Sequence, residues 1–141
     1  MATAAGQDRG DLARNTVTVM DDEMVTWLTA QLDADYKAAS AATAGPWGYH
    51  PSREFRMPGG DPLEFVGRGQ IDSPSFSGIA ATGPAGDPQS MADAGHIARH
   101  DPEHVRLDVE AKRRIIERHP EVVPLLVSAY RDRAGYRDEW S

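Results

Sequence analysis

The chain contains no cysteine among its 141 residues. Without a thiol it can form no disulfide, no thiolate metal site and no cysteine nucleophile, which fits a reducing compartment. Long apolar runs are also missing: no stretch approaches the ~20 residues that cross a membrane, and the N-terminus lacks the apolar core of a signal peptide. We therefore expect a cytoplasmic protein without membrane contact, in which a metal would need His, Asp or Glu as ligands.

Positive charge is scarce in the first two-thirds of the chain. Residues 1–95 carry 6 basic and 13 acidic side chains, residues 96–141 carry 9 of each, and the net charge is −7. Sequence-independent nucleic-acid binding needs clustered Lys and Arg to neutralise phosphates, so this distribution argues against it. Hydrophobic residues make up 40% of the chain, enough to form one core.

The N-terminal region changes character at Asp21. Residues 1–20 are rich in Ala, Gly, Asp and Arg and are expected to form a disordered leader, with residues 21–141 as a single domain. From Asp21 onward, capping acids precede apolar residues spaced three to four apart, which predicts an amphipathic helix with Trp27 on its core side. Gly45, in a left-handed conformation, and Pro46 should end this helix.

Short β-type segments separated by turn-forming residues occupy the middle of the chain. Trp47 and Tyr49 alternate as in a strand, and residues 63–66 and 76–81 are further strand candidates. The Pro, Gly and Asp residues between them predict tight turns. We expect an α+β fold, with a small antiparallel β-meander packed by the N-terminal amphipathic helix and by a C-terminal group of two to three helices.

The sequence of the C-terminal half predicts helices separated by prolines. Ser90, with Asp93 three residues on, has the spacing of a capping box for a short helix. Asp101 followed by a proline predicts the N-cap of the next helix, which should span 102–119. A last helix is expected over 121–133, with a proline in its first turn.

Four blocks of the sequence carry a family resemblance. They are Met20 to Asp33, the Thr-Ala-Gly-Pro-Trp turn at 43–47, the Ala-Asp-Ala-Gly-His-Ile-Ala-Arg-His-Asp-Pro block at 92–102 with 109–115, and the Tyr-Arg-Asp-Glu-Trp end at 136–140. Together they resemble a family of small uncharacterised proteins of Streptomyces-type actinobacteria and their bacteriophages, with a more distant similarity to phage proteins of the Ead type. Ala44 replaces the proline expected in the turn. The resemblance implies a phage-related or mobile-element setting and no particular activity.

The histidines are the residues most suited to metal chemistry. His96 and His100 are four apart on a predicted helix, which places both imidazoles on one face, as in many zinc sites. His104, His50 or Asp93 could supply a third ligand for zinc or manganese. The alternative is structural: His100 bonds carbonyls at the helix end and His96 packs beside Trp47.

Nothing else in the sequence forms a catalytic set, and no cofactor is predicted. We expect a non-enzymatic interaction or regulatory module that binds a protein partner through exposed aromatic side chains, with Trp47, Tyr136 and Trp140 as candidates. Tyr136 and Trp140 lie in an otherwise polar tail and could instead dock onto the core. A metal-binding protein or metal-dependent hydrolase using the histidines is the alternative. Nucleic-acid binding by arginines on consecutive helices is a weaker one; the residues are Arg99, Arg106, Arg113 and Arg114.

Overall fold

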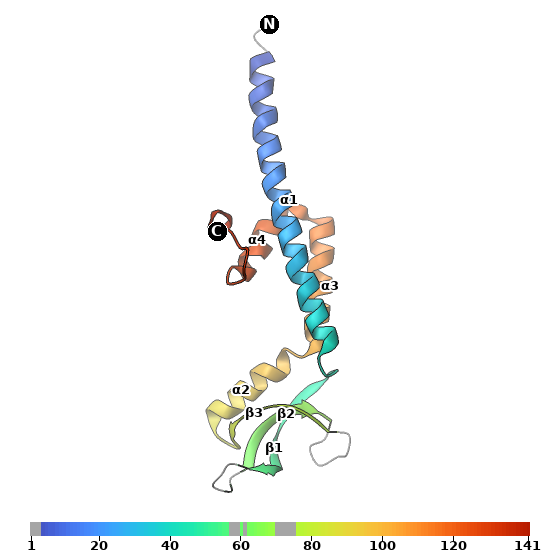
Figure 1. The fold of residues 1–141 in the computed structure, drawn as a ribbon, viewed down its shortest axis with the longest axis vertical. Coiled ribbons are helices and arrows are strands. Elements are labelled where there is room, and N and C mark those ends of the chain that lie inside the picture. Colours follow the sequence, from blue (N-terminus) through green and yellow to red (C-terminus); the bar gives the residue numbers. More distant parts are fainter. Residues whose placement is uncertain (1–3, 57–59, 61, 70–75) are drawn as a thin grey trace. The chain divides into compact units, whose positions relative to one another are not determined.

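A computed structural model describes residues 4–56, 60, 62–69 and 76–141, of which 4–21 and 50–56 are described for the backbone alone. The fold is α+β with a small antiparallel meander, as the sequence predicts (Figure 1). The main elements are α1 (Ala4–Ala41), β1 (Trp47–Arg56), β2 (Pro62–Arg68), β3 (Ser77–Pro84), α2 (Pro88–Arg99), α3 (Pro102–Arg118) and α4 (Val123–Val127). Short 3-10 turns follow as η1 (Pro120–Val122), η2 (Ser128–Tyr130) and η3 (Asp138–Trp140).

The chain divides into two compact units. One unit comprises residues 1–34 and 110–141, and the other comprises residues 35–109. The first, the helical unit, contains most of α1, the end of α3 and the C-terminal turns. The second, the sheet unit, contains the β-meander with α2. We describe each unit by itself.

Helix α1 begins at Ala4, well before the start predicted at Asp21. Helix α1 thus includes residues 4–20, and residues 1–3 lie outside the described residues. The physical reason is continuity: no proline precedes Pro46, and alanine, leucine and arginine favour the helix over this stretch. The acids at 21–23 lie inside the helix rather than at its first turn.

The core of the helical unit is built on the stripe that the periodicity of α1 predicts. Met24, Leu28 and Leu32, each four residues apart, are all buried. Trp27 contacts the C-terminal aromatic rings, with centroid distances of 5.8 Å to Tyr136 and 5.4 Å to Trp140. The C-terminal tail therefore packs onto α1 as part of this core.

The C-terminal helix expected over 121–133 is broken into shorter pieces. The chain forms η1, α4 and η2 in succession, and Val123, Val127 and Tyr130 are buried. Pro124 lies in the first turn of α4, as expected. Two prolines within five residues, at 120 and 124, remove backbone donors and restrict the preceding residues, which favours short turns over one continuous helix.

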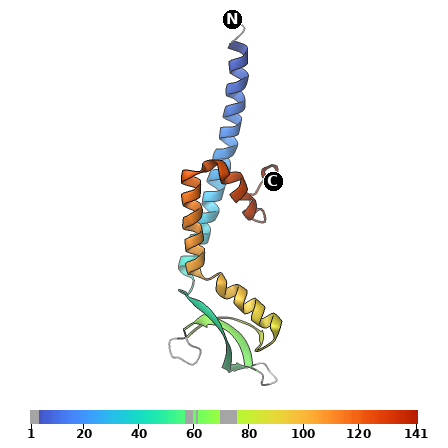
Figure 2. The ribbon, with the colours of Figure 1, turned by 180° about the vertical axis from the view of Figure 1, so that it is seen from behind.

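The sheet unit is a three-stranded antiparallel meander in the order β1-β2-β3. Both views show α2 lying across one face of this sheet (Figures 1 and 2), and α2 contacts all three strands. The middle strand β2 buries Glu64 and Val66. Close packing explains Gly67, because a Cβ there would clash with the ring of Phe76.

Helix α2 is capped differently from the prediction. Its N-cap is Asp87, whose carboxylate accepts a hydrogen bond from the Ser90 backbone N–H at 3.0 Å, and Pro88 occupies the first turn. Ser90 is buried inside the helix, with its hydroxyl 3.1 Å from the same carboxylate. The capping box expected for Ser90 and Asp93 is therefore wrong: the N-cap lies three residues earlier, at Asp87, and Pro88 follows it in the first turn.

Asp101 organises the corner at which α3 begins. One carboxylate oxygen accepts the His104 backbone N–H at 2.9 Å, which confirms the predicted N-cap. The other oxygen accepts the Trp47 backbone N–H at 3.2 Å. Gly45 approaches this carboxylate so closely that a Cβ would lie 2.7 Å from it. Gly45 has no positive φ, so this close approach, and not the predicted left-handed conformation, is what calls for glycine there.

Candidate functional site

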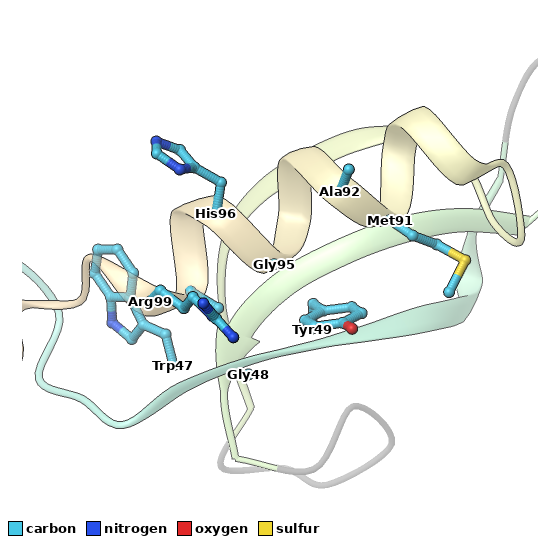
Figure 3. A pocket seen from close by; sticks show the side chains of 9 residues that line it. Trp47, Gly48, Tyr49, Met91, Ala92, Gly95, His96 and Arg99 are labelled. Carbon is cyan, nitrogen blue, oxygen red and sulfur yellow. The ribbon is translucent and has the colours of Figure 1, made fainter.

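The sheet unit carries an open groove between β1 and α2. Its volume is about 770 Å³. The side chains of Tyr49, Met91 and Arg99 lie between the helix and the strand (Figure 3). The full lining is Trp47, Gly48, Tyr49, Met91, Ala92, Gly95, His96, Ala98 and Arg99.

One face of α2 forms one side of the groove. Met91, Gly95 and Arg99 are four residues apart on α2, so they share one face of the helix. Gly95 has no side chain to occupy the groove. A Cβ there would lie 3.6 Å from Tyr49 Cε1, which is an ordinary contact, and a longer side chain would extend further and fill the groove. The glycine therefore leaves space above the Tyr49 ring.

Apolar and aromatic surface is exposed along the groove. Tyr49 is 42% exposed and Met91 is 41% exposed, which is high for side chains of this size in a small unit. The sequence showed Tyr49 only as part of a strand and Met91 only as part of a helix. The glycine inside α2 was the signal that could have found this site, because a helix-interior glycine often marks a close approach.

The groove is cationic within an acidic protein. Arg99 is exposed, has no ion-pair partner within the described part of the chain, and lies in a lining that contains no carboxylate. His96 is exposed at the same rim. An anionic group entering the groove would meet Arg99 without competition from a carboxylate in the described lining.

Trp47 is held in place at one end of the groove. Its backbone N–H donates to Asp101, and its indole Nε1–H donates to the Thr43 carbonyl at 2.8 Å. Both donors of this residue are therefore occupied by the protein. The ring, half-buried, offers its π surface rather than a hydrogen bond to a ligand.

The predicted metal ligands stack along the corner between α2 and α3. The ring centroids of His96 and His100 are 4.5 Å apart, and those of His100 and His104 are 5.8 Å apart. His100 Nδ1 lies 2.8 Å from the His96 carbonyl, as in the structural alternative. Among the residues with described side chains, no group of three His, Cys, Asp or Glu is arranged to hold a metal. The side chain of His50 lies outside the described residues.

The C-terminal aromatic candidates belong to the helical unit. Trp140 is only 6% exposed, so it does not form the exposed anchor that the sequence suggested. Its ring meets Trp27 in a tilted arrangement and Tyr136 edge to face, and its buried Nε1 has no hydrogen-bond partner among the described residues. Tyr136 is half-buried and its hydroxyl is 2.9 Å from Ser141 Oγ. The tail therefore packs on the core of the helical unit.

The candidate nucleic-acid arginines have separate local environments. Arg106 pairs with Glu103 at 2.7 Å in the sheet unit, and Arg113 pairs with Asp33 at 2.8 Å in the helical unit. Arg114 is exposed on α3, and Arg99 lies in the groove. Two of the four cations are therefore already paired with carboxylates.

None of the helices described in the structure has the length and apolar character needed to cross a membrane.

The fold and the groove define the class of this chain as an α+β protein that combines a helix-covered β-meander with a helical unit. Residues 21–141 match the DUF6221 family, a family of unknown function, and the chain belongs to it. Comparison with curated proteins and comparison with solved structures each gave no match. Residues 1–20 precede the matched region.

Proposed function

We propose that the protein is a non-enzymatic interaction module and that the groove between β1 and α2 is its binding surface. The observation that carries this is the exposure of Tyr49 and Met91 on either side of a groove that also holds the unpaired Arg99. Aromatic residues, methionine and arginine are enriched where proteins bind one another, and Met adapts its shape to different ligands. The phage-related or mobile-element setting suggested by the family resemblance remains part of this proposal.

Two features support binding rather than catalysis at this site. The groove lacks a nucleophile with an adjacent base: its polar side chains are those of Tyr49, His96, Arg99 and the indole of Trp47. It is also open rather than enclosed, and an open, mixed surface suits a macromolecular ligand better than a small molecule that must be buried on most sides. The histidine-based alternative has no third ligand in reach within the described side chains.

The proposal is tested by comparing captured proteins across variants. Tagged protein is incubated with lysate of the source organism, and bound proteins are quantified for wild type, Tyr49→Ala and Leu125→Ser. Leu125 is 76% exposed in the helical unit and controls for the loss of an unrelated apolar surface. We expect a partner that is retained by wild type and Leu125→Ser and lost by Tyr49→Ala, at unchanged melting temperature. Equal retention by all three would place binding elsewhere and refute the proposal.

A further inference from the structure

The free edge of β1 lies beside the groove. In the order β1-β2-β3, β1 pairs only with β2, and no other described strand pairs with its outer edge. An unpaired edge presents a row of backbone donors and acceptors to any extended chain that reaches it. In this protein the Trp47 N–H already bonds Asp101 and Pro51 has no N–H, so Tyr49 supplies the donor at this part of the edge, beside carbonyl acceptors of alternate residues. The edge borders exposed side chains from both β1 and α2.

The backbone direction can be assigned from Trp47. Its N–H donates to Asp101 outside the sheet, so this residue directs its backbone away from β2. In an antiparallel strand, residues that bond to the neighbour alternate with residues that point away. Tyr49, two residues on, therefore directs its N–H and C=O to the open edge, while its side chain enters the groove.

We propose that the partner contributes an extended acidic segment that pairs with the β1 edge at Tyr49, fills the groove with an apolar side chain, and places a carboxylate at Arg99. This rests on the groove being the binding surface. Charge complementarity supports it: the groove holds Arg99, and its lining among the described residues includes no carboxylate. Backbone pairing supplies affinity and the groove supplies specificity, as in other cases of strand addition.

The geometry also sets the spacing within the partner. Met91 and Arg99 are two helical turns apart, which is about 12 Å at the rise of an α-helix. An extended chain covers that distance in about four residues. The carboxylate and the apolar side chain should then lie four apart and on the same face of the partner strand. A segment with the two groups on adjacent residues would direct them to opposite faces.

The first test is selection from a displayed library of short unstructured peptides against wild type, Arg99→Glu and Arg114→Glu. Arg114 is an exposed arginine outside the groove, so its variant has the same net charge. We expect wild type and Arg114→Glu to select peptides with an acid four residues from an apolar residue. Binding of these peptides should fall at least about tenfold in Arg99→Glu and weaken with added salt. Selection without acid preference, or equal binding by Arg99→Glu, overturns the proposal.

The second test examines strand addition itself, using a selected peptide methylated at single backbone nitrogens. If the peptide pairs with β1, methyl groups at alternate positions abolish binding and those between them do not, because only every second N–H faces the strand. No effect at any position overturns strand addition. The proposal is also overturned if the free protein forms a dimer that dissociates in Tyr49→Ala, because the β1 edge would then bind a second copy of this chain.

These results separate this inference from the function on which it rests. If no peptide is selected, but lysate still yields a partner that Tyr49→Ala loses, the groove binds something other than an acidic strand. In that case the present inference fails and the proposed function stands. If neither a peptide nor a Tyr49-dependent partner is found, both fail.

Discussion

Asp101 stabilises the sheet unit through two hydrogen bonds that a single substitution removes. Asp101→Ala deletes the N-cap of α3, which costs about 1 kcal/mol. It also leaves the part-buried Trp47 N–H without its acceptor, and an unmade hydrogen bond of this kind costs about 1 kcal/mol at the low end of its range. We therefore expect a loss of about 2 kcal/mol in the free energy of unfolding.

Asp101→Asn is the matched comparison. Asparagine is as good an N-cap as aspartate, so its single oxygen can accept the His104 N–H, but its amide group presents a donor to the Trp47 N–H. The expected loss is then about 1 kcal/mol, roughly half that of alanine. Urea unfolding gives the free energies, and amide hydrogen exchange at Trp47 and His104 shows which bond each variant has lost. A cost below about 0.5 kcal/mol for Asp101→Ala would refute the assigned role.

Gly45 provides an internal check on the same carboxylate. Gly45→Ala places a Cβ 2.7 Å from Asp101 Oδ2, and forcing the two apart costs about 1–3 kcal/mol. In the Asp101→Ala background the obstructing atom is absent, so the alanine at 45 should cost much less. The two substitutions must then be non-additive. If their effects add to within about 0.5 kcal/mol, the close approach is not what selects glycine.

Four further substitutions test particular contacts. Gly95→Ala should raise the stability of the sheet unit by about 1 kcal/mol, because the added methyl makes an ordinary contact and favours the helix; a lower melting temperature would contradict this. If Asp87 is the N-cap of α2, Asp87→Ala should lower the free energy of unfolding in urea by about 1 kcal/mol. No loss of stability would mean that another residue caps the helix. Trp140→Phe removes a buried N–H that has no acceptor among the described residues, so it should lower stability by less than about 1 kcal/mol. Trp140→Ala removes the ring as well and should lower it by about 3–5 kcal/mol, both measured by thermal unfolding. Equal losses would show that the N–H has a hydrogen-bond partner. Arg113→Ala breaks an exposed ion pair and should change unfolding free energy by under about 1 kcal/mol, a change that shrinks in high salt.

The parts of the fold predicted well from sequence are those fixed by local chemistry. Asp101 before a proline can scarcely do anything other than cap a helix, and the structure confirms that it does. The β-meander was predicted because its turns are rich in proline and glycine, residues with narrow or special backbone preferences. The buried stripe of α1 followed from a four-residue period. Each of these signals acts within a few residues of the chain.

The errors have the opposite origin, since they concern choices that local signals leave open. Ser90 and Asp87 are both good capping residues three apart, and only the loop from β3 decides which one begins the helix. The sequence left open whether Trp140 docks onto the core or onto a partner, and the structure packs it on Trp27, more than a hundred residues away in sequence. The groove likewise joins Tyr49 to Gly95, which no periodicity in either element could reveal.

The groove and the corner of α3 share one support. The carboxylate that caps α3 also bonds the Trp47 N–H, so the first residue of β1 is anchored where that helix begins. Trp47 lines the groove, whereas Asp101 does not. A strand added at Tyr49 would lie two residues from the Trp47–Asp101 hydrogen bond. If the backbone moves when this bond is lost, the N–H and C=O of Tyr49 are misplaced for pairing. Asp101→Ala should therefore weaken groove binding without removing any group that touches the ligand, and Asp101→Asn, which restores only the helix cap, should not rescue it.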